Sequence, residues 1–316
     1  MTTGDRDSPE YVVASREGLY VVNHEHWRRV ADGYFFGVTV LGADVYCFKT
    51  VSRETAVSEP RAGQIVRYRC SPGGAFPGPE ILVRGLDHNC HQVDFFDGSF
   101  YVVDTRGQSL IEFDDNWRCV GIHQILPPAD EGGPEYAHLN SFLGCDDTIY
   151  VMQHNFRRQL PSKIVEFDRR FRVRRTITLS LSACHDVVRL ENGRLLFCES
   201  HLGRLSCDDG SSYQIDNLLT RGLAVGPNEI AVGSSLYGQR LARDLLPGFV
   251  TFLDRSYRRI ARLHLPAAPT QIRRLDGFDL SLSQPRQWRQ TFIGEENAPV
   301  PTADVMPLKP TMLTRS

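Results

Sequence analysis

The sequence predicts an all-β protein, a six-bladed β-propeller, and three observations support this prediction. Short runs rich in β-branched and aromatic residues fill the chain, bounded by turns of Gly, Asp and Asn. These runs recur in groups of four, which is the composition of one propeller blade. The two ends of the chain carry complementary parts of one further group. We therefore expect a ring of blades that is closed by pairing the chain ends.

The clearest group of four strands runs from Cys90 to His123. It reads HQVDFF, a DG turn, SFYVVDT, an RGQ turn, SLIEFDD and WRCVGIHQ. The next group repeats this order as HLNSFL, TIYVMQ, SKIVEFD and FRVRRTITL, and two later groups begin HDVVRL and GLAV. One earlier group begins FGVTVL. The tight turns within each group indicate antiparallel hairpins.

The remaining strands predict a sixth blade that is shared by both ends of the chain. EYVVAS, GLYVVN and HWRRVA match the second to fourth strands of a blade, and PTQIRRLDG supplies the missing first strand. Closure of the ring removes exposed sheet edges, whereas an open sandwich of hairpins is the alternative. We expect a single propeller over residues 1–280. Residues 281–316 carry several prolines and no blade pattern, and form either a disordered tail or a strap anchored by Trp288 and Phe292.

Composition narrows the classes of function. The chain has 41% hydrophobic and 23% charged residues and a formal net charge of -2, which gives no electrostatic basis for binding nucleic acid. Its first residues are polar, and no apolar run approaches the roughly 20 residues of a membrane helix. The eight cysteines are scattered, as expected for buried thiols in a reducing compartment. We expect a cytoplasmic monomer with neither a nucleic-acid nor a membrane partner.

Three histidines occupy the same position in three successive groups. His91, His138 and His185 each open the first strand of a group, at equal spacing along the chain. First strands line the channel of a propeller and begin on one face. These side chains are therefore predicted to meet at one mouth of the channel.

Further histidines are predicted on the same face. His154 and His201 follow the ends of second strands, and His88 lies in the loop before His91. The long connections 51–64, 124–136, 154–162 and 234–248 belong to this face, whereas the turns on the other side are short. Long loops on a rigid scaffold commonly carry function.

Converging neutral imidazoles favour a metal site. Three of them leave a fourth position open on zinc, where a bound water has its pKa lowered to about 7. The set suits zinc first and copper or iron next, with His88, His154 and His201 as additional ligands or as residues that orient them. If the histidines instead pack within the blades and bond to backbone carbonyls, a ligand-binding module is indicated.

Other polar residues are predicted beside this mouth. Tyr136 is a candidate general acid or base, and Arg221 is a candidate for holding a carboxylate. Glu199 ends a second strand and could complete an iron site, whereas alternation along the strand turns Asp186 away from the channel. Arg106 and Arg240 are weaker candidates.

The blade pattern over about Glu10 to Gly277 resembles, by architecture, the six-bladed propellers of the NHL, gluconolactonase and strictosidine synthase-like group. Gluconolactonases bind metal through Glu, Asn and Asp, and no matching trio appears at the strand starts. The three strand-start histidines, with Tyr136 and Arg221, resemble in kind the site of peptidyl-α-hydroxyglycine amidating lyases. Those six-bladed propellers hold zinc with three histidines beside a tyrosine and an arginine. The resemblance implies metal chemistry without implying a substrate.

The sequence thus predicts a metal-dependent enzyme, a lyase or hydrolase acting on a small polar substrate. Two alternatives stay open. One is a non-haem iron or copper oxidoreductase that uses the same histidines. The other is a non-catalytic propeller that binds a ligand or a protein on the looped face.

Overall fold

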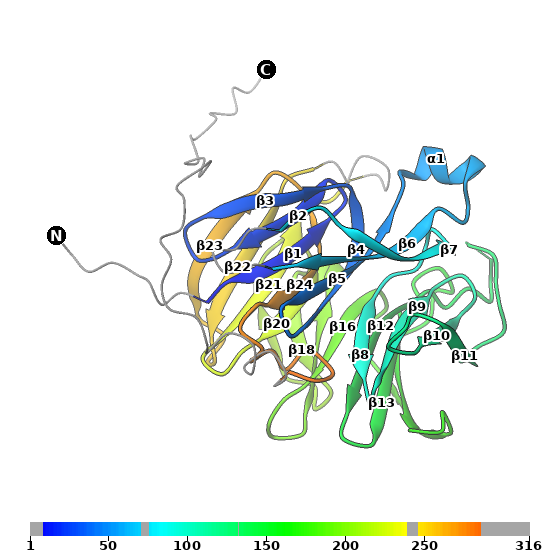
Figure 1. Ribbon diagram of the computed structural model, residues 1–316. Coiled ribbons are helices and arrows are strands. Elements are labelled where there is room, and N and C mark those ends of the chain that lie inside the picture. Colours follow the sequence, from blue (N-terminus) through cyan, green and yellow to red (C-terminus); the bar gives the residue numbers. More distant parts are fainter. Residues whose placement is uncertain (1–8, 71–75, 132, 239–245, 286–316) are drawn as a thin grey trace.

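The computed structural model describes residues 9–70, 76–131, 133–238 and 246–285 of the chain. These residues form six four-stranded antiparallel sheets, which are the blades of a six-bladed propeller (Figure 1). Within each blade the strands follow one another from the channel outward. The closing blade contains β24 (Pro269–Arg274), β1 (Tyr11–Ser15), β2 (Gly18–Val22) and β3 (Trp27–Asp32), and the next two contain β4 (Tyr34–Leu41), β5 (Asp44–Thr50), β6 (Gly63–Arg69) and β7 (Glu80–Leu86), then β8 (Val93–Phe96), β9 (Ser99–Asp104), β10 (Ser109–Phe113) and β11 (Cys119–Gln124). The last three blades contain β12 (Leu139–Cys145), β13 (Thr148–Gln153), β14 (Lys163–Asp168) and β15 (Val173–Thr178), then β16 (Cys184–Arg189), β17 (Leu195–Glu199), β18 (Arg204–Cys207) and β19 (Ser212–Gln214), and finally β20 (Leu219–Val225), β21 (Glu229–Ser235), β22 (Gly248–Asp254) and β23 (Arg259–Leu265).

The ring closes as predicted, by pairing the two ends of the chain. Strand β24 runs antiparallel to β1, with Ile272 opposite Val13 and Arg274 opposite Tyr11. Figure 1 shows orange β24 beside blue β1. The closing blade packs on the preceding one through Tyr11 and Phe252, whose ring centroids lie 5.5 Å apart. Burial of side chains of this size contributes about 1.5–3 kcal/mol each.

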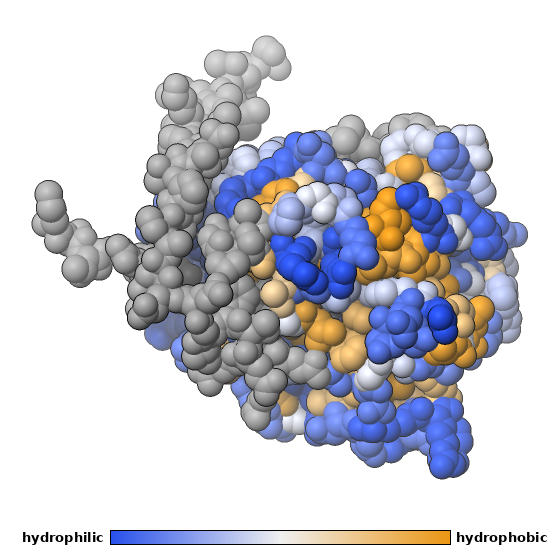
Figure 2. All heavy atoms as spheres, viewed as in Figure 1, coloured by the Kyte–Doolittle hydropathy of each residue, from blue (hydrophilic) through white to orange (hydrophobic). Residues whose placement is uncertain are grey.

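Burial decreases from the channel outward. All residues of β1 and β13 are buried, because these strands carry neighbours on both faces. The outermost strand β15 reads VRRTIT and is exposed along almost its whole length. On the face drawn in Figure 2, apolar surface forms separate patches among hydrophilic residues. No helix in the described part of the chain is long and apolar enough to cross a membrane.

Two short helices of the described residues belong to connections between strands. Helix α1 (Arg53–Ser58) follows β5, and its N-terminus is capped by Ser52, whose Oγ accepts from the Thr55 backbone N–H. The 3-10 helix η1 (Ser200–Leu202) follows β17 and contains His201. Both connections lie on the same side as the starts of β8, β12 and β16. We call this side the histidine face.

Several innermost strands carry an irregularity near the histidine face. The register shifts between Phe35 and Val38, Leu139 and Ser141, His185 and Val188, and Thr220 and Leu223. Such bulges re-aim side chains at the mouths of barrels and beside active sites. Here they place His185 and Asp186 along the same small cavity in the channel. The prediction that alternation turns Asp186 away from the channel is therefore wrong.

The chain after β24 crosses the end of the channel opposite the histidine face. Asp279 accepts from the backbone N–H groups of Arg274 (2.7 Å) and Val225 (3.3 Å). Further along, Ser283 Oγ donates to Asp94 Oδ2 (2.9 Å) and accepts from the Gly144 N–H (2.8 Å). Residues 276–285 thus form a strap that links four blades. The proposed anchors Trp288 and Phe292 lie outside the described residues.

Candidate functional site

The histidine face contains a cavity of about 230 Å³, which we call the histidine pocket. Histidines from three blades meet in it, together with arginines and a few apolar residues. Its lining residues are Arg16, His91, His138, His154, Phe156, Arg157, His185, His201, Leu219, Arg221 and Gly238. Five of the six candidate histidines therefore come together where the repeat places them. The exception is His88.

Four of the imidazole rings form a continuous chain of contacts. Ring centroids lie 4.8 Å apart between His91 and His138, 4.9 Å between His138 and His154, and 4.7 Å between His154 and His185. The first and last of these contacts are edge-to-face, with interplanar angles of 81° and 72°. His201 joins the group through Phe156, whose ring centroid lies 4.7 Å from its own.

His91 is held with one nitrogen as a hydrogen-bond donor. Its Nδ1 lies 2.6 Å from the carbonyl oxygen of Asn89 and 2.8 Å from Thr105 Oγ1. A carbonyl can only accept, and the Thr105 hydroxyl already donates to the Leu139 carbonyl (2.7 Å). The proton of neutral His91 is therefore on Nδ1, and the lone pair is on Nε2. This is the tautomer found in histidines that bind metal through Nε2.

The other rings are oriented by the backbone and by one serine. His185 Nδ1 lies 2.7 Å from Oγ of Ser200, which is fully buried at the start of η1. His138 has a φ of 57°, in the left-handed region that non-glycine residues seldom occupy. The carbonyl of His154 accepts from Ser162 Oγ (2.8 Å) and from the Ala183 N–H (3.0 Å), which fixes the loop that follows β13.

Imidazole nitrogens are suitable ligands for a divalent metal, but the pocket histidines are not arranged as a set of metal ligands in this structure. Among residues 9–70, 76–131, 133–238 and 246–285, no three His, Cys, Asp or Glu side chains are grouped so as to hold a metal ion. Metal binding by His91, His138 and His185 would require the nitrogens of the three rings to lie closer together than they do in this arrangement. The predicted zinc set, and its copper and iron variants, stays a prediction.

Of the three proposed catalytic residues, Arg221 lines the pocket and Tyr136 lies beside it. The Tyr136 side chain is buried, and its ring packs edge-to-face on His138 with centroids 5.4 Å apart. Glu199 lies outside the lining. Its buried carboxylate is bonded to Arg204 Nε and lies 3.4 Å from Ser180 Oγ. This carboxylate therefore faces the outer strand β18.

The sequence did not predict that Arg16 and Arg157 line this pocket, or that the Phe36 ring lies against Arg16. Arg16 and Arg157 line the pocket, and the Arg16 guanidinium lies 4.5 Å from the centroid of Phe36. The guanidinium of Arg221 lies 5.7 Å from the same ring. Arg16 follows β1, the second strand of its blade, so the rule that found His154 and His201 would also have found Arg16. Arg157 lies in one of the long loops, where no repeat position predicts it.

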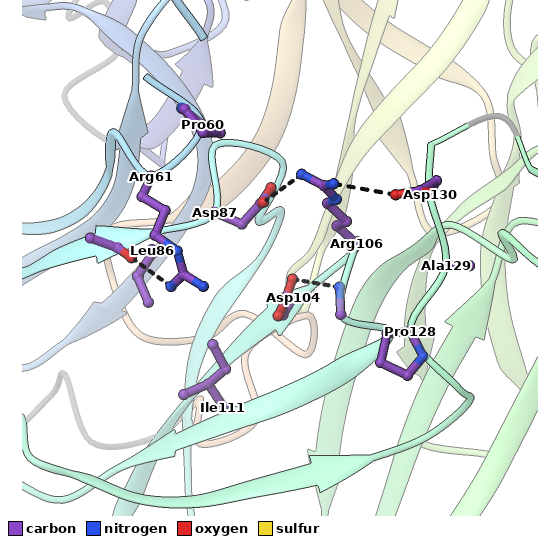
Figure 3. A pocket seen from close by; sticks show the side chains of 12 residues that line it. Pro60, Arg61, Leu86, Asp87, Asp104, Arg106, Ile111, Pro128, Ala129 and Asp130 are labelled. Carbon is purple, nitrogen blue, oxygen red and sulfur yellow. Dashed lines mark hydrogen bonds and ion pairs between the residues drawn. The ribbon is translucent and has the colours of Figure 1, made fainter. Parts of the chain in front are cut away.

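A larger cavity of about 530 Å³ lies between two neighbouring blades of the histidine face and is shown in Figure 3. Arg106 lies there, between Asp130 (3.2 Å) and Asp87 (3.8 Å). Asp104 accepts from the Gly107 N–H (2.9 Å), and burial, followed by the nearby charge of Asp87, raises the pKa of its carboxyl. The charges of this cavity largely balance one another. His88 lies near its rim, with Nδ1 3.3 Å from the Pro60 carbonyl oxygen, and Arg240 is outside the described residues.

Comparison with known proteins identifies a fold. No protein-family model matches the chain, and no curated protein matches it in sequence. Among solved structures, a nidogen/laminin complex aligns with a TM-score of 0.61 at 12% identity, over 87% of this chain and 99% of that chain. A protein of unknown function from Bacteroides caccae aligns with a TM-score of 0.55 at 10% identity, over 84% and 99% of the two chains. The WD40 propeller domain of Doa1 aligns with a TM-score of 0.53 at 11% identity, over 84% and 82%.

These matches show a propeller and nothing more specific. At 10–12% sequence identity, the alignments do not match the residues of a site in this chain to residues of a site in the other proteins. The function must be argued from the pocket itself.

Proposed function

We propose that the protein is a metal-dependent enzyme, a lyase or hydrolase, whose active site is the histidine pocket. One observation carries the proposal. Four histidines at or next to the ends of separate strands meet in one small cavity, and His91 is fixed in the tautomer that leaves Nε2 as the lone-pair nitrogen. Histidines that serve packing alone do not need to form a continuous row of four rings in one cavity.

The proposed ligands are His91, His138 and His185, with His154 as an additional ligand or a proton carrier. A bound zinc ion would supply a water of lowered pKa and would polarise a substrate carbonyl. Ligands on the starts of rigid strands keep a fixed geometry better than ligands on loops. Hydrogen bonds of His91 Nδ1 to the Asn89 carbonyl and Thr105 Oγ1, and of His185 Nδ1 with Ser200 Oγ, would keep the two imidazoles oriented.

The remaining residues bind and orient the substrate in this proposal. Arg221 would hold an acidic group of the substrate, because a guanidinium offers paired N–H donors to an oxyanion. Tyr136, whose ring packs edge-to-face on His138 beside the pocket, would serve as a general acid or base. The volume of about 230 Å³ fits a small molecule.

The test is elemental analysis of protein purified without a metal-binding tag. We expect close to one zinc per chain in the parent and none in a His91→Ala, His138→Ala, His185→Ala variant that melts cooperatively. His26→Ala, at an exposed position near Glu25, is the control and should keep the metal. Single variants at each of the three positions cover the case in which the triple variant fails to fold.

The result also separates the alternatives. Iron or copper in place of zinc would replace the lyase or hydrolase with an oxidoreductase on the same histidines. A parent that binds no metal even after reconstitution would overturn the enzyme proposal. It would leave a propeller that binds a ligand or protein on its looped face.

A further inference from the structure

We propose that the histidine pocket selects small organic anions: molecules with a carboxylate or phosphate group at the histidine and arginine side and an apolar body at the rim. This inference deepens the proposed function, because it names the substrate class of the same pocket. It rests on the charge and shape of the lining, and its test works on protein without metal.

The described lining of the histidine pocket is positively charged. Every ionisable side chain that the structure describes there is an arginine or a histidine; the lining includes Arg16, Arg157 and Arg221. Guanidinium groups stay charged at any physiological pH. In a cavity of about 230 Å³ these charges are close to any ligand that enters. The formal net charge of the whole chain is -2, so the positive lining is a local feature.

The neighbouring cavity differs from the histidine pocket in its charges. There, Arg106 lies between Asp87 and Asp130, and a third carboxylate, Asp104, faces the same space (Figure 3). The two cavities both lie on the histidine face, and both are lined by arginines. They differ in that the described lining of the histidine pocket includes no carboxylate. An anionic ligand would therefore complement the histidine pocket, whereas the balanced charges of the other cavity favour neither sign.

An aromatic ring holds two of the guanidinium groups in place. Arg16 and Arg221 both lie against Phe36, with the guanidinium carbons 4.5 and 5.7 Å from the ring centroid. Arg16 is only 5% exposed, and its Nη1 donates to the Tyr34 hydroxyl (3.1 Å). Stacking on an aromatic ring restricts a guanidinium without using its in-plane N–H donors. Partial burial also strengthens its attraction for an anion relative to the attraction in bulk water.

The rim of the histidine pocket carries exposed apolar side chains. Phe156 lines the pocket, is 44% exposed and packs on the rings of His154 and His201. Tyr237 is also exposed and donates its hydroxyl to the His201 carbonyl, and Leu202 is exposed beside it. Apolar surface that is held at the mouth of a charged cavity favours a ligand with an aromatic or aliphatic body.

The experiment measures binding to chelator-treated protein by calorimetry, so that a metal–ligand bond makes no contribution. The probes are hippurate, its neutral amide hippuramide, and phenyl phosphate. We expect at least one of the two anions to bind about tenfold or more tightly than hippuramide, the difference that a charge-assisted hydrogen bond provides. Comparing hippurate with phenyl phosphate shows which oxyanion is preferred. If neither anion binds more tightly than the amide, the proposal is overturned.

Variants assign the selectivity to this pocket. Arg221→Gln, and separately Arg157→Gln at an exposed position, should reduce the preference for the anion several-fold, whereas Arg106→Gln in the neighbouring cavity should leave it unchanged. Phe156→Ala should weaken hippurate and hippuramide by the same factor. An anion preference that survives both Arg221→Gln and Arg157→Gln would place the site elsewhere and overturn the assignment. Thermal melts of each variant check that it is folded.

The two proposals fail independently. A protein that binds no metal but prefers the anions would refute the metalloenzyme and keep the anion site. A protein that binds zinc but does not distinguish hippurate from hippuramide after chelation would keep the metal proposal and refute this inference.

Discussion

The Nδ1 atom of His91 lies 2.6 Å from the carbonyl oxygen of Asn89, two residues earlier in the chain. The tight turn that makes this possible begins at Asp87, whose Oδ1 accepts from the Asn89 N–H (2.9 Å) and whose carbonyl accepts from the Cys90 N–H (3.1 Å). An Asx-type turn of this kind orders a loop through local bonds alone. The ring of His91 is thus oriented before any ligand arrives, and the proposed site depends on a local sequence motif.

Removal of the second restraint on His91 should weaken metal binding without unfolding the protein. In Thr105→Val the buried Thr105 hydroxyl is lost, and with it the bonds to His91 Nδ1 and to the Leu139 carbonyl. We expect metal affinity to fall by about 10–100-fold, the usual effect of losing a residue that orients a ligand. Competition with a chromophoric chelator measures the affinity.

Two controls accompany Thr105→Val. Thr105→Ser keeps the hydroxyl and should restore most of the affinity. Thr148→Val removes a hydroxyl that bonds to Asp147, at a turn away from the histidine face, and should leave affinity unchanged. Equal affinities in Thr105→Val and in the parent would show that Thr105 has no orienting role.

Buried carboxylates around the channel should make stability depend on pH. Asp94, Asp186 and Asp279 are all buried, and burial raises the pKa of each, against the opposing charge of Arg273. A carboxyl whose pKa is raised by folding binds its proton more tightly in the native state. Its contribution is therefore greatest at low pH and is lost as pH rises from the ordinary value of about 4 through the raised one.

The variant Asp94→Asn isolates one of these groups. The advantage in unfolding free energy of the parent over this variant should decrease as pH rises above about 4. Asp147→Asn is the control of opposite sign, because hydrogen bonds from Arg174 and Thr148 lower the pKa of that exposed carboxyl to about 2. There the parent should gain on the variant between about pH 2 and 4 and then stay level. Urea unfolding at a series of pH values tests both, and an advantage over Asp94→Asn that grows with pH would contradict the prediction.

Gly37 allows β4 to approach the backbone of His91. A Cβ at this position would overlap the His91 carbonyl oxygen and lie 2.9 Å from Gln92 Cα. Gly37→Ala should therefore push two innermost strands apart, cost about 1–3 kcal/mol or more of stability, and weaken ligand binding in the histidine pocket. Gly78→Ala is the matched control, because a Cβ at that position would have nothing within 4 Å. Unchanged denaturation midpoints in both variants would contradict this account.

The strap should contribute to stability without affecting the pocket. Ser283→Ala removes the hydroxyl that bonds to Asp94 and to the Gly144 N–H, leaving both groups buried with one partner fewer. We expect a loss of about 1–3 kcal/mol in unfolding free energy and no change in hippurate affinity, since the strap crosses the opposite end of the channel. Ser211→Ala, in an exposed turn, is the control. A change in hippurate affinity in Ser283→Ala would indicate coupling between the two ends of the channel.

The fold and the shared face of three histidines were predictable because each repeat of the sequence forms the same four-stranded blade. Equivalent positions in successive blades must lie at the same height in a propeller, so equal spacing was enough to bring His91, His138 and His185 to one face. Closure by β24 was predictable for the same reason, since the end strands are the missing parts of one blade.

The sequence by itself therefore determined the six blades, their closure and the meeting of the histidines. Only the tertiary structure decided which polar neighbours share the pocket. Bulges in the innermost strands override simple alternation and bring Asp186 to the channel, whereas Glu199 turns to Arg204 because that strand neighbour lies within reach. Arg157 reaches the pocket from a long loop whose path has no period. Positions set by the repeat can be read from spacing, but positions set by bulges, loops and contacts between distant segments depend on the packing of the whole ring.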